Sequence, residues 1–168
     1  LSHSQKLLAI GLKLRYSPAG HQLLDKPRSH ECAYTTFDPQ KNVWSSWTML
    51  DVPHRDGKFY QVAPGCVQWL EKDDGTLLIP CYVSQQEGGH YTTTVLHCSF
   101  DGQTLKYLAN GNEMTIPSGR GLYEPSLTRN GRKYFLTLRS DDAAWVTTSD
   151  DGLNFTEPQK WTFDDGAD

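Results

Sequence analysis

The 168-residue sequence predicts an all-β fold, and three observations support this prediction. Apolar residues rarely recur at the spacing of three and four positions that marks an amphipathic helix. Short runs rich in β-branched and aromatic residues instead alternate with Gly, Pro, Asp and Asn, which is the pattern of strands joined by turns. The 14 Gly and 9 Pro residues provide for many tight turns.

Eleven stretches have the composition of strands, and polar sequences such as DPQKN, DDG, FDGQ and RNGR separate them. In these turns Asp and Asn accept local hydrogen bonds, and Gly supplies a positive φ. The expected strands are residues 7–16, 30–38, 45–50, 65–72, 75–84, 91–101, 105–110, 124–130, 133–140, 144–151 and 159–163.

An internal repeat groups these strands into three similar units. Each unit has an apolar strand, a loop, a Thr-rich strand, a turn that contains Asp, and a strand that carries an aromatic residue or Leu. The turn residues are Asp38, Asp101 and Asp151, which lie 63 (101 minus 38) and 50 (151 minus 101) positions apart. This spacing fits a four-stranded propeller blade of roughly 40–50 residues plus insertions.

We therefore expect one partial β-propeller over residues 1–168, made of four-stranded antiparallel blades. The approximate blade bounds are 1–60, 61–118 and 119–168. Closed propellers contain roughly four to eight blades, so three blades are too few to close a ring. We expect either a fragment of a propeller with five to seven blades, six being favoured, or chains that associate to close the ring.

The third of the Asp turns, TSDDGLNF, resembles the Asp-box (BNR repeat) of sialidase-like, or neuraminidase-like, propellers. That box reads Ser/Thr-x-Asp-x-Gly-x-Thr-Trp. Thr148, Asp150 and Gly152 match it, whereas Asn154 and Phe155 replace its Thr and Trp. The other two turns are weaker copies. The alternative is a chance Asp-Gly hairpin in a β-sandwich.

Residues 120–142 carry the candidate chemistry. Glu124 lies at the start of one expected strand and Arg139 at the end of the next, so a turn at Asn130-Gly131 would bring them together. Sialidase-like hydrolases carry a Glu and, about 15 residues later on the paired strand, an Arg; 139 minus 124 is 15. The resemblance implies that Glu124 activates a Tyr nucleophile and that Arg139 is one of three Arg residues that hold the carboxylate of sialic acid. It also implies that the other two Arg residues, the acid/base Asp and the Tyr nucleophile lie outside residues 1–168.

Each candidate also has an ordinary alternative, because Glu at a strand start and Arg at a strand end are often solvated. Tyr123 could form an aromatic wall for a sugar ring or pack under the turn. Arg120 could reach an anionic sugar or remain a solvated loop residue. In a propeller, ligands bind at one mouth of the central channel. Tyr82 is the second-repeat counterpart of Arg139, and it would line that mouth or be a half-buried strand residue. His90 and His54 lie in loops rich in Gly or Asp and could also face that mouth.

The resemblance predicts a carbohydrate-active hydrolase, similar to an exo-α-sialidase, that acts on carboxylated glycans. A second possibility is a lyase that cleaves uronic-acid glycans by β-elimination. In that case Tyr123 or a His is the base, and an Arg neutralises the carboxylate. A third possibility is a non-catalytic glycan-binding propeller.

Composition argues against other classes of partner. The net charge is −4 and Lys and Arg form no block, which disfavours nucleic acid. Apolar runs are too short for a membrane-spanning helix. The four Cys residues form no C-x-x-C pair, so we expect no metal site and no cofactor, while a disulfide is left open. We expect a secreted or periplasmic protein whose signal segment is not in this chain; its oligomeric state is open.

Overall fold

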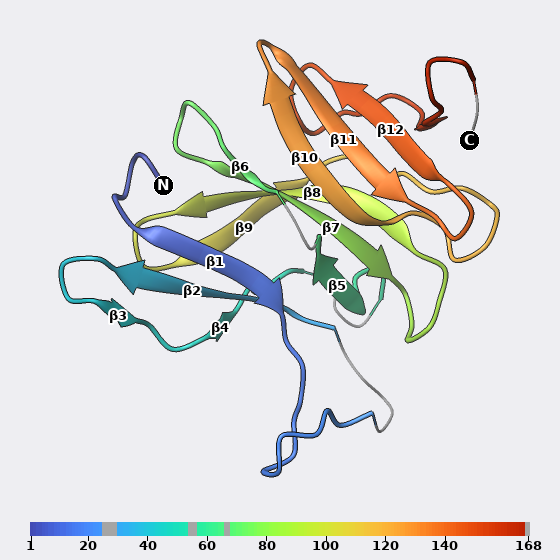
Figure 1. Cartoon of the computed structure of the whole chain (residues 1–168). Coiled ribbons are helices and arrows are strands. Elements are labelled where there is room, and N and C mark those ends of the chain that lie inside the picture. Colours follow the sequence, from blue (N-terminus) through green and yellow to red (C-terminus); the bar gives the residue numbers. More distant parts are fainter. Residues whose placement is uncertain (25–29, 54–56, 66–67, 167–168) are drawn as a thin grey trace.

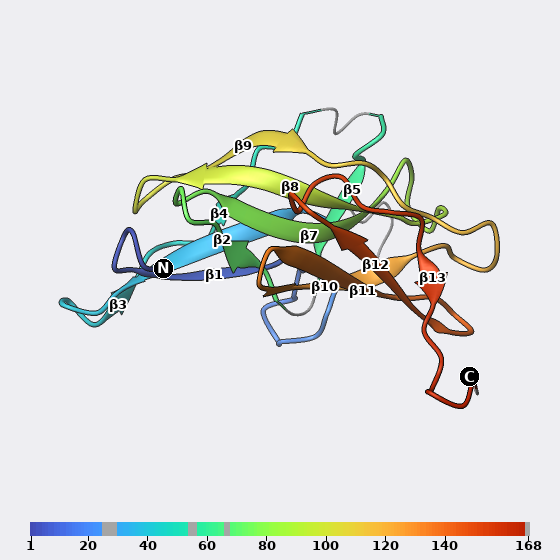
Figure 2. The ribbon, with the colours of Figure 1, turned by 90° about the horizontal axis from the view of Figure 1, so that it is seen from above.

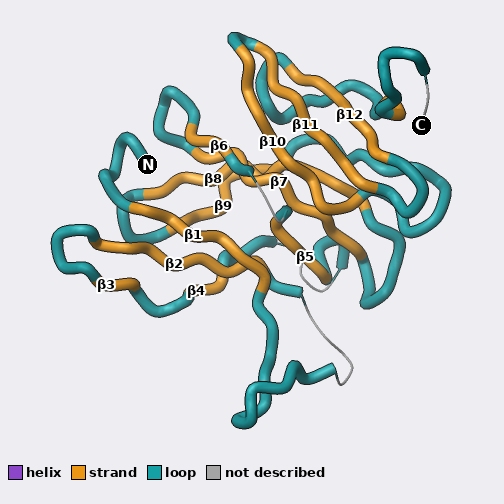
Figure 3. Tube along the Cα trace, viewed as in Figure 1, coloured by secondary structure: helices purple, strands orange, loops and turns teal. Residues whose placement is uncertain are grey.

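The computed structural model describes residues 1–24, 30–53, 57–65 and 68–166, and this part of the chain is all-β. Figures 1 and 3 show strands and loops and no helix in these ranges. The described residues thus include no helix that is long and apolar enough to cross a membrane. The prediction of an all-β chain is confirmed.

The strands form three antiparallel sheets that follow one another along the chain (Figure 1). The first sheet contains β1 (Leu7–Leu12), β2 (Cys32–Asp38), β3 (Val43–Trp44) and β4 (Thr48–Met49). The second contains β5 (Gln61–Pro64), β6 (Leu70–Glu71), β7 (Leu77–Ser84), β8 (Thr92–Phe100) and β9 (Leu105–Asn110). The third contains β10 (Tyr123–Asn130), β11 (Lys133–Arg139), β12 (Ala144–Ser149) and β13 (Gln159–Lys160).

The antiparallel sheets of four and five strands agree with the predicted all-β class and with the antiparallel pairing of its strands. In the third sheet the strands are hydrogen-bonded in the order of the sequence, as in a propeller blade. No closed ring of sheets is seen in the described ranges, so the propeller itself stays a prediction.

The middle sheet is covered on both faces, and this is where the core lies (Figure 2). Every residue of β7 except Tyr82 is buried. Its odd-numbered residues, such as Leu77 and Ile79, pack in one cluster with the first sheet, through Leu8 and Tyr34. On the other face, Leu78 packs in a second cluster with residues of the third sheet. Two buried faces explain why this strand has a continuous apolar sequence rather than an alternating one.

Several strand predictions were wrong at their bounds: the expected strand 45–50 is only β4, with β3 missed before it, and the expected strand 159–163 is only β13. The first strand ends at Leu12, four residues before the predicted end. Of the predicted strand 65–72, the described residues form only β6, and the sequence analysis missed β5. Both short strands pair with the same edge of β7. A strand of four residues that ends in Pro carries too little alternation to be recognised from sequence.

The Asp turns are the clearest structural repeat among the three sheets. In each one the Asp Oδ1 accepts hydrogen bonds from the backbone N–H groups two and three residues ahead, at 2.7–3.3 Å. The bonds run to Asp38 from Gln40 and Lys41, to Asp101 from Gln103 and Thr104, and to Asp151 from Leu153 and Asn154.

The outer hairpins of the first and third sheets also share a hydroxyl contact. Thr35 Oγ1 donates to the carbonyl of Ser45 at 2.8 Å, and Thr147 Oγ1 donates to the carbonyl of Thr156 at 2.6 Å. In both pairs the two side-chain hydroxyl oxygens lie 3.0 Å apart. The first and third sheets therefore share this side-chain hydrogen bond in addition to the Asp turn that the sequence repeat predicted.

The register of the third turn differs from the Asp-box alignment by one residue. Asp151 and Ser149, rather than Asp150 and Thr148, make the internal hydrogen bonds of the turn. Asp150 points outward, is 87% exposed and pairs with Lys133 at 3.0 Å. The internal repeat had placed Asp151 in the turn, and the structure confirms it, whereas the Asp-box alignment had placed Asp150 there. Only the turn geometry decides between the two adjacent Asp residues.

Three of the Cys residues, Cys32, Cys81 and Cys98, are buried free thiols, whereas Cys66 lies outside the described residues. Burial raises the pKa of the Cys98 thiol to about 12, so this group stays protonated. Among the described residues, no cluster of three or more His, Cys, Asp or Glu could hold a metal ion.

Asp151→Ala should destabilise the protein by roughly 1–2 kcal/mol, because it removes a carboxylate that accepts several hydrogen bonds within the turn. Urea unfolding followed by fluorescence measures this loss. Asp150→Ala is the matched control and should change the free energy of unfolding by about 0.5 kcal/mol or less. Equal losses in the two variants would mean that the turn register described here is wrong.

Candidate functional site

The β10–β11 hairpin brings Glu124 and Arg139 together. Asn130 pairs with Lys133 across the turn, and Tyr123 pairs with Arg139 at the far end of the hairpin. Arg139 Nη1 lies 2.8 Å from Glu124 Oε2. The sequence spacing therefore predicted this neighbourhood correctly.

A β-bulge between Tyr123 and Ser126 orients Glu124. Glu124 has a φ of 49°, which lies in the left-handed region that residues other than Gly rarely adopt. Such a conformation costs roughly 1–3 kcal/mol and persists only where the surroundings impose it. Here Pro125 follows, and its carbonyl lies so close to Gly65 that a Cβ on that glycine would collide with it. Bulges re-aim side chains, and strained residues concentrate at functional sites.

A second Arg–carboxylate pair lies beside the first. The Asp141 carboxylate accepts hydrogen bonds from the backbone N–H of Arg120 at 2.9 Å and from its Nε at 2.8 Å. Arg120 Nη2 is 2.7 Å from the same carboxylate. The Arg120 side chain, followed by its backbone N–H, lowers the pKa of Asp141 to about 2. The sequence analysis missed Asp141; its only sequence signal was its place two residues after the strand that ends at Arg139.

Tyr123 lies under both guanidinium groups. The Cζ atoms of Arg120 and Arg139 are 4.5 Å and 5.3 Å from the centroid of its ring, distances typical of cation–π contacts. The Tyr123 hydroxyl donates to Asp141 Oδ1 at 3.0 Å and accepts from Arg120 Nη2 at 2.7 Å. Burial, followed by the Asp141 bond, raises the pKa of Tyr123. Tyr123 is 3% exposed, so its hydroxyl is engaged within the protein.

Two further rings extend the aromatic surface. Tyr82 lies 6.4 Å from Tyr123 and 5.1 Å from Tyr91, measured between ring centroids, and Tyr91 lies 5.8 Å from Tyr123. We call these three rings the tyrosine platform. Tyr82 was a predicted site residue, whereas Tyr91 was missed because nothing in a Thr-rich strand distinguishes it from a packing residue.

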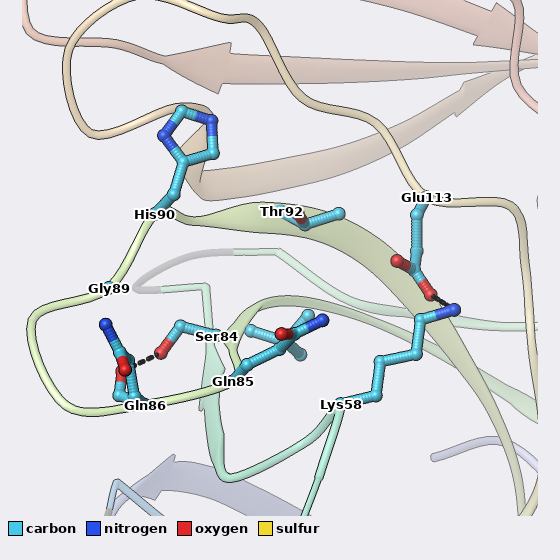
Figure 4. Close-up of a pocket in the computed structure, with 9 residues that line it drawn as sticks. Lys58, Ser84, Gln85, Gln86, Gly89, His90, Thr92 and Glu113 are labelled. Atoms are coloured by element: carbon cyan, nitrogen blue, oxygen red, sulfur yellow. Dashed lines mark hydrogen bonds and ion pairs between the residues drawn. The ribbon is translucent and has the colours of Figure 1, made fainter.

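His90 is next to the platform in sequence, but its ring makes other contacts. Its Nε2 lies 2.9 Å from the carbonyl of Ile116 and 2.9 Å from Thr115 Oγ1. A carbonyl can only accept, so Nε2 is the protonated ring nitrogen. His90 thus anchors a loop and lines a separate cavity (Figure 4). The other loop candidate, His54, lies outside the described residues.

The two ion pairs remain accessible to a ligand. The side chains of Arg120 and Arg139 are 56% and 58% exposed. Hydrogen bonding to Asp141 and to Glu124, respectively, raises the pKa of each guanidinium, so both stay charged. Guanidinium groups offer several donors in a planar fork that matches a carboxylate. The arrangement can therefore bind an anionic group above an aromatic surface.

Comparison with known proteins adds no assignment. Neither the protein-family models nor the curated proteins give a significant match to this sequence. The function of the two Arg pairs is therefore inferred from their geometry and chemistry.

Asp141→Asn should reduce the dependence of stability on acid pH. The folded-state pKa of Asp141, about 2, lies below its ordinary value, so the ionised form stabilises the fold above about pH 4. That contribution is lost as the pH falls from about 4 towards 2. We expect the free energy of unfolding, measured by urea unfolding, to fall more steeply over this window in the wild type than in the variant.

Asp142→Asn removes a neighbouring carboxylate of the same loop and is the matched control. Its free energy of unfolding should fall between about pH 4 and pH 2 nearly as steeply as that of the wild type. The Asp141 carboxyl carbon can also be titrated directly by NMR. A midpoint near the ordinary Asp value would contradict the described contact with Arg120.

Proposed function

We propose that this chain belongs to a sialidase-like glycoside hydrolase that acts on glycans bearing a carboxylated sugar. The observation that carries the proposal is the Glu124–Arg139 contact, made by a strained residue at a bulge. The strain costs free energy that an ordinary surface ion pair, worth at most about 1 kcal/mol, offsets poorly. A functional demand on the position of Glu124 gives a reason for it.

In this proposal the sugar carboxylate binds to Arg139, with Arg120 as the second cation. Tyr82 and Tyr91, the two half-buried rings of the tyrosine platform, support the apolar face of the sugar ring, while Tyr123 is buried beneath the guanidinium groups. Glu124 acts as the base that activates the nucleophile, as the sialidase resemblance implies. Tyr123 is not proposed as that nucleophile, because its hydroxyl is buried, hydrogen-bonded and less acidic than usual.

The proposal includes the propeller. Three consecutive sheets carry equivalent Asp turns, and the middle one packs against both of its neighbours. Face-to-face packing of successive four-stranded sheets is how propeller blades are arranged. A ring of five to seven blades, six being favoured, would surround the site.

A non-catalytic glycan-binding propeller is the second candidate. The observation that favours it is that each charged group of the site already has a partner of opposite charge. A lyase with Tyr123 as base is less well supported, because abstraction of a proton by Tyr123 would need a phenolate, and its pKa is raised.

Arg139→Ala should weaken the binding of N-acetylneuraminic acid or glucuronic acid by about 10- to 100-fold. The variant removes charge-assisted hydrogen bonds worth roughly 1.5–3 kcal/mol. Titration calorimetry or NMR measures the binding, and fluorogenic aryl glycosides of both acids measure turnover by the complete propeller that the proposal assumes. Glu124→Gln should abolish turnover and leave the protein folded.

Arg129→Ala is the matched control. Arg129 lies on the same hairpin, pairs with Asp73 at 3.2 Å and places its guanidinium 5.5 Å from the Tyr134 ring centroid. Its loss should leave acidic-sugar binding unchanged. Unchanged binding in Arg139→Ala would refute the site. Binding without turnover would favour the glycan-binding module, and an unsaturated product that absorbs in the ultraviolet would identify a lyase.

A further inference from the structure

A polar cavity of about 420 Å³ lies at the end of the middle sheet (Figure 4). It is lined by Lys58, by the end of β7 and the hairpin that leads to β8, and by Glu113 in the segment after β9. Its volume lies within the range of small-molecule sites. None of its lining residues belongs to the two Arg pairs.

The cavity presents hydrogen-bonding groups without a net charge. Lys58 and Glu113 form an ion pair at one side, so their charges cancel. The exposed side chains of Gln85 and Gln86 add amide groups. Amides, an ammonium and a carboxylate together offer both donors and acceptors, which suits hydroxyl groups. A free anion would instead meet the Glu113 carboxylate.

Ser84 gives the cavity a polar floor. Ser84 is buried, and its hydroxyl oxygen lies 2.8 Å from Gln61 Oε1 and 2.7 Å from the carbonyl of Gln86. Gln61 is also buried. Buried polar groups destabilise a protein unless they are hydrogen-bonded, and here they bond to one another. A polar floor disfavours an apolar ligand.

The cavity and the tyrosine platform both lie at the end of the β7–β8 hairpin but are lined by different side chains. Tyr82 pairs with Thr93, and Val83, which lines the cavity, pairs with Thr92. Because successive strand residues point to opposite faces, Val83 faces away from Tyr82, whereas Ser84, which also lines the cavity, lies on the Tyr82 face. None of the three platform rings lines the cavity. A ligand in the cavity therefore need not touch the Arg pairs.

We infer that this cavity is a second carbohydrate-binding site, which takes an uncharged sugar through its hydroxyl groups. The inference goes beyond the proposed function and does not need it, because the groups involved are different. It assigns to one chain two sites of different charge selectivity: a cationic one for an acidic sugar and a neutral one for a hexose.

The test is an NMR titration of the 168-residue protein with methyl β-galactoside and, separately, with N-acetylneuraminic acid. We expect the galactoside to shift the amide signals of Gln85, Gln86 and Glu113 with saturation. The acidic sugar should shift those of Arg120 and Arg139. The inference is overturned if the galactoside does not shift the amide signals of the cavity residues. It is also overturned if only the acidic sugar shifts them.

The double variant Lys58→Met/Glu113→Gln should weaken galactoside binding by about tenfold, equivalent to roughly one hydrogen bond. Lys133→Met/Asp150→Asn removes an exposed ion pair of the third sheet and should leave binding unchanged. If the first double variant does not fold, Gln85→Ala tests the same contact from an exposed position. Unchanged affinity in a folded cavity variant overturns the inference.

The two proposals fail separately. If the wild-type protein binds the galactoside at the cavity but does not bind the acidic sugar, the proposed function is overturned and the cavity site is supported. The reverse result overturns the cavity site and leaves the proposed function standing.

Discussion

Burial of both faces of the middle sheet is the constraint on which the rest of the structure depends. Strand β7 contributes to two apolar clusters, one shared with each neighbouring sheet. A sheet with one solvated face would allow its neighbours to shift, whereas close packing on two faces fixes the position of both. The third sheet is held so close that Gly65 has no room for a side chain against the carbonyl of Pro125. The same contact lies next to Glu124, so core packing and site geometry are linked.

The Arg pairs show how this packing shapes chemistry. Arg120 comes from the loop before β10, Arg139 ends β11, and Asp141 follows in the next loop. Their common point is the ring of Tyr123, which is buried against Tyr82 and Tyr91 of the middle sheet. The cations are therefore positioned by an aromatic surface that two sheets build together. Most of their charge faces solvent, which is what a site for an anionic sugar requires.

The two proposed sites differ in the way their charges are arranged. At the platform, each guanidinium is more than half exposed and can exchange part of its hydrogen bonding for a ligand. In the cavity, the ion pair sits beside amides and a polar floor, so the local charge is balanced. Both sites lie at the end of the β7–β8 hairpin, but no residue of the platform or of the Arg pairs lines the cavity.

The sequence by itself determined the all-β class, the Asp turns and the meeting of Glu124 with Arg139. Each depends on local rules: turn residues, strand composition, and the arithmetic of a two-stranded hairpin. Only the tertiary structure decided which Asp of an adjacent pair faces inward, that β5 exists, and that Asp141 and Tyr91 join the site. The inward-facing Asp is fixed by hydrogen bonds within the turn itself, whereas β5, Asp141 and Tyr91 depend on contacts between segments farther apart in the chain. The bulge at Glu124 belongs with them, because the close approach of Gly65 to Pro125 accompanies its strained φ.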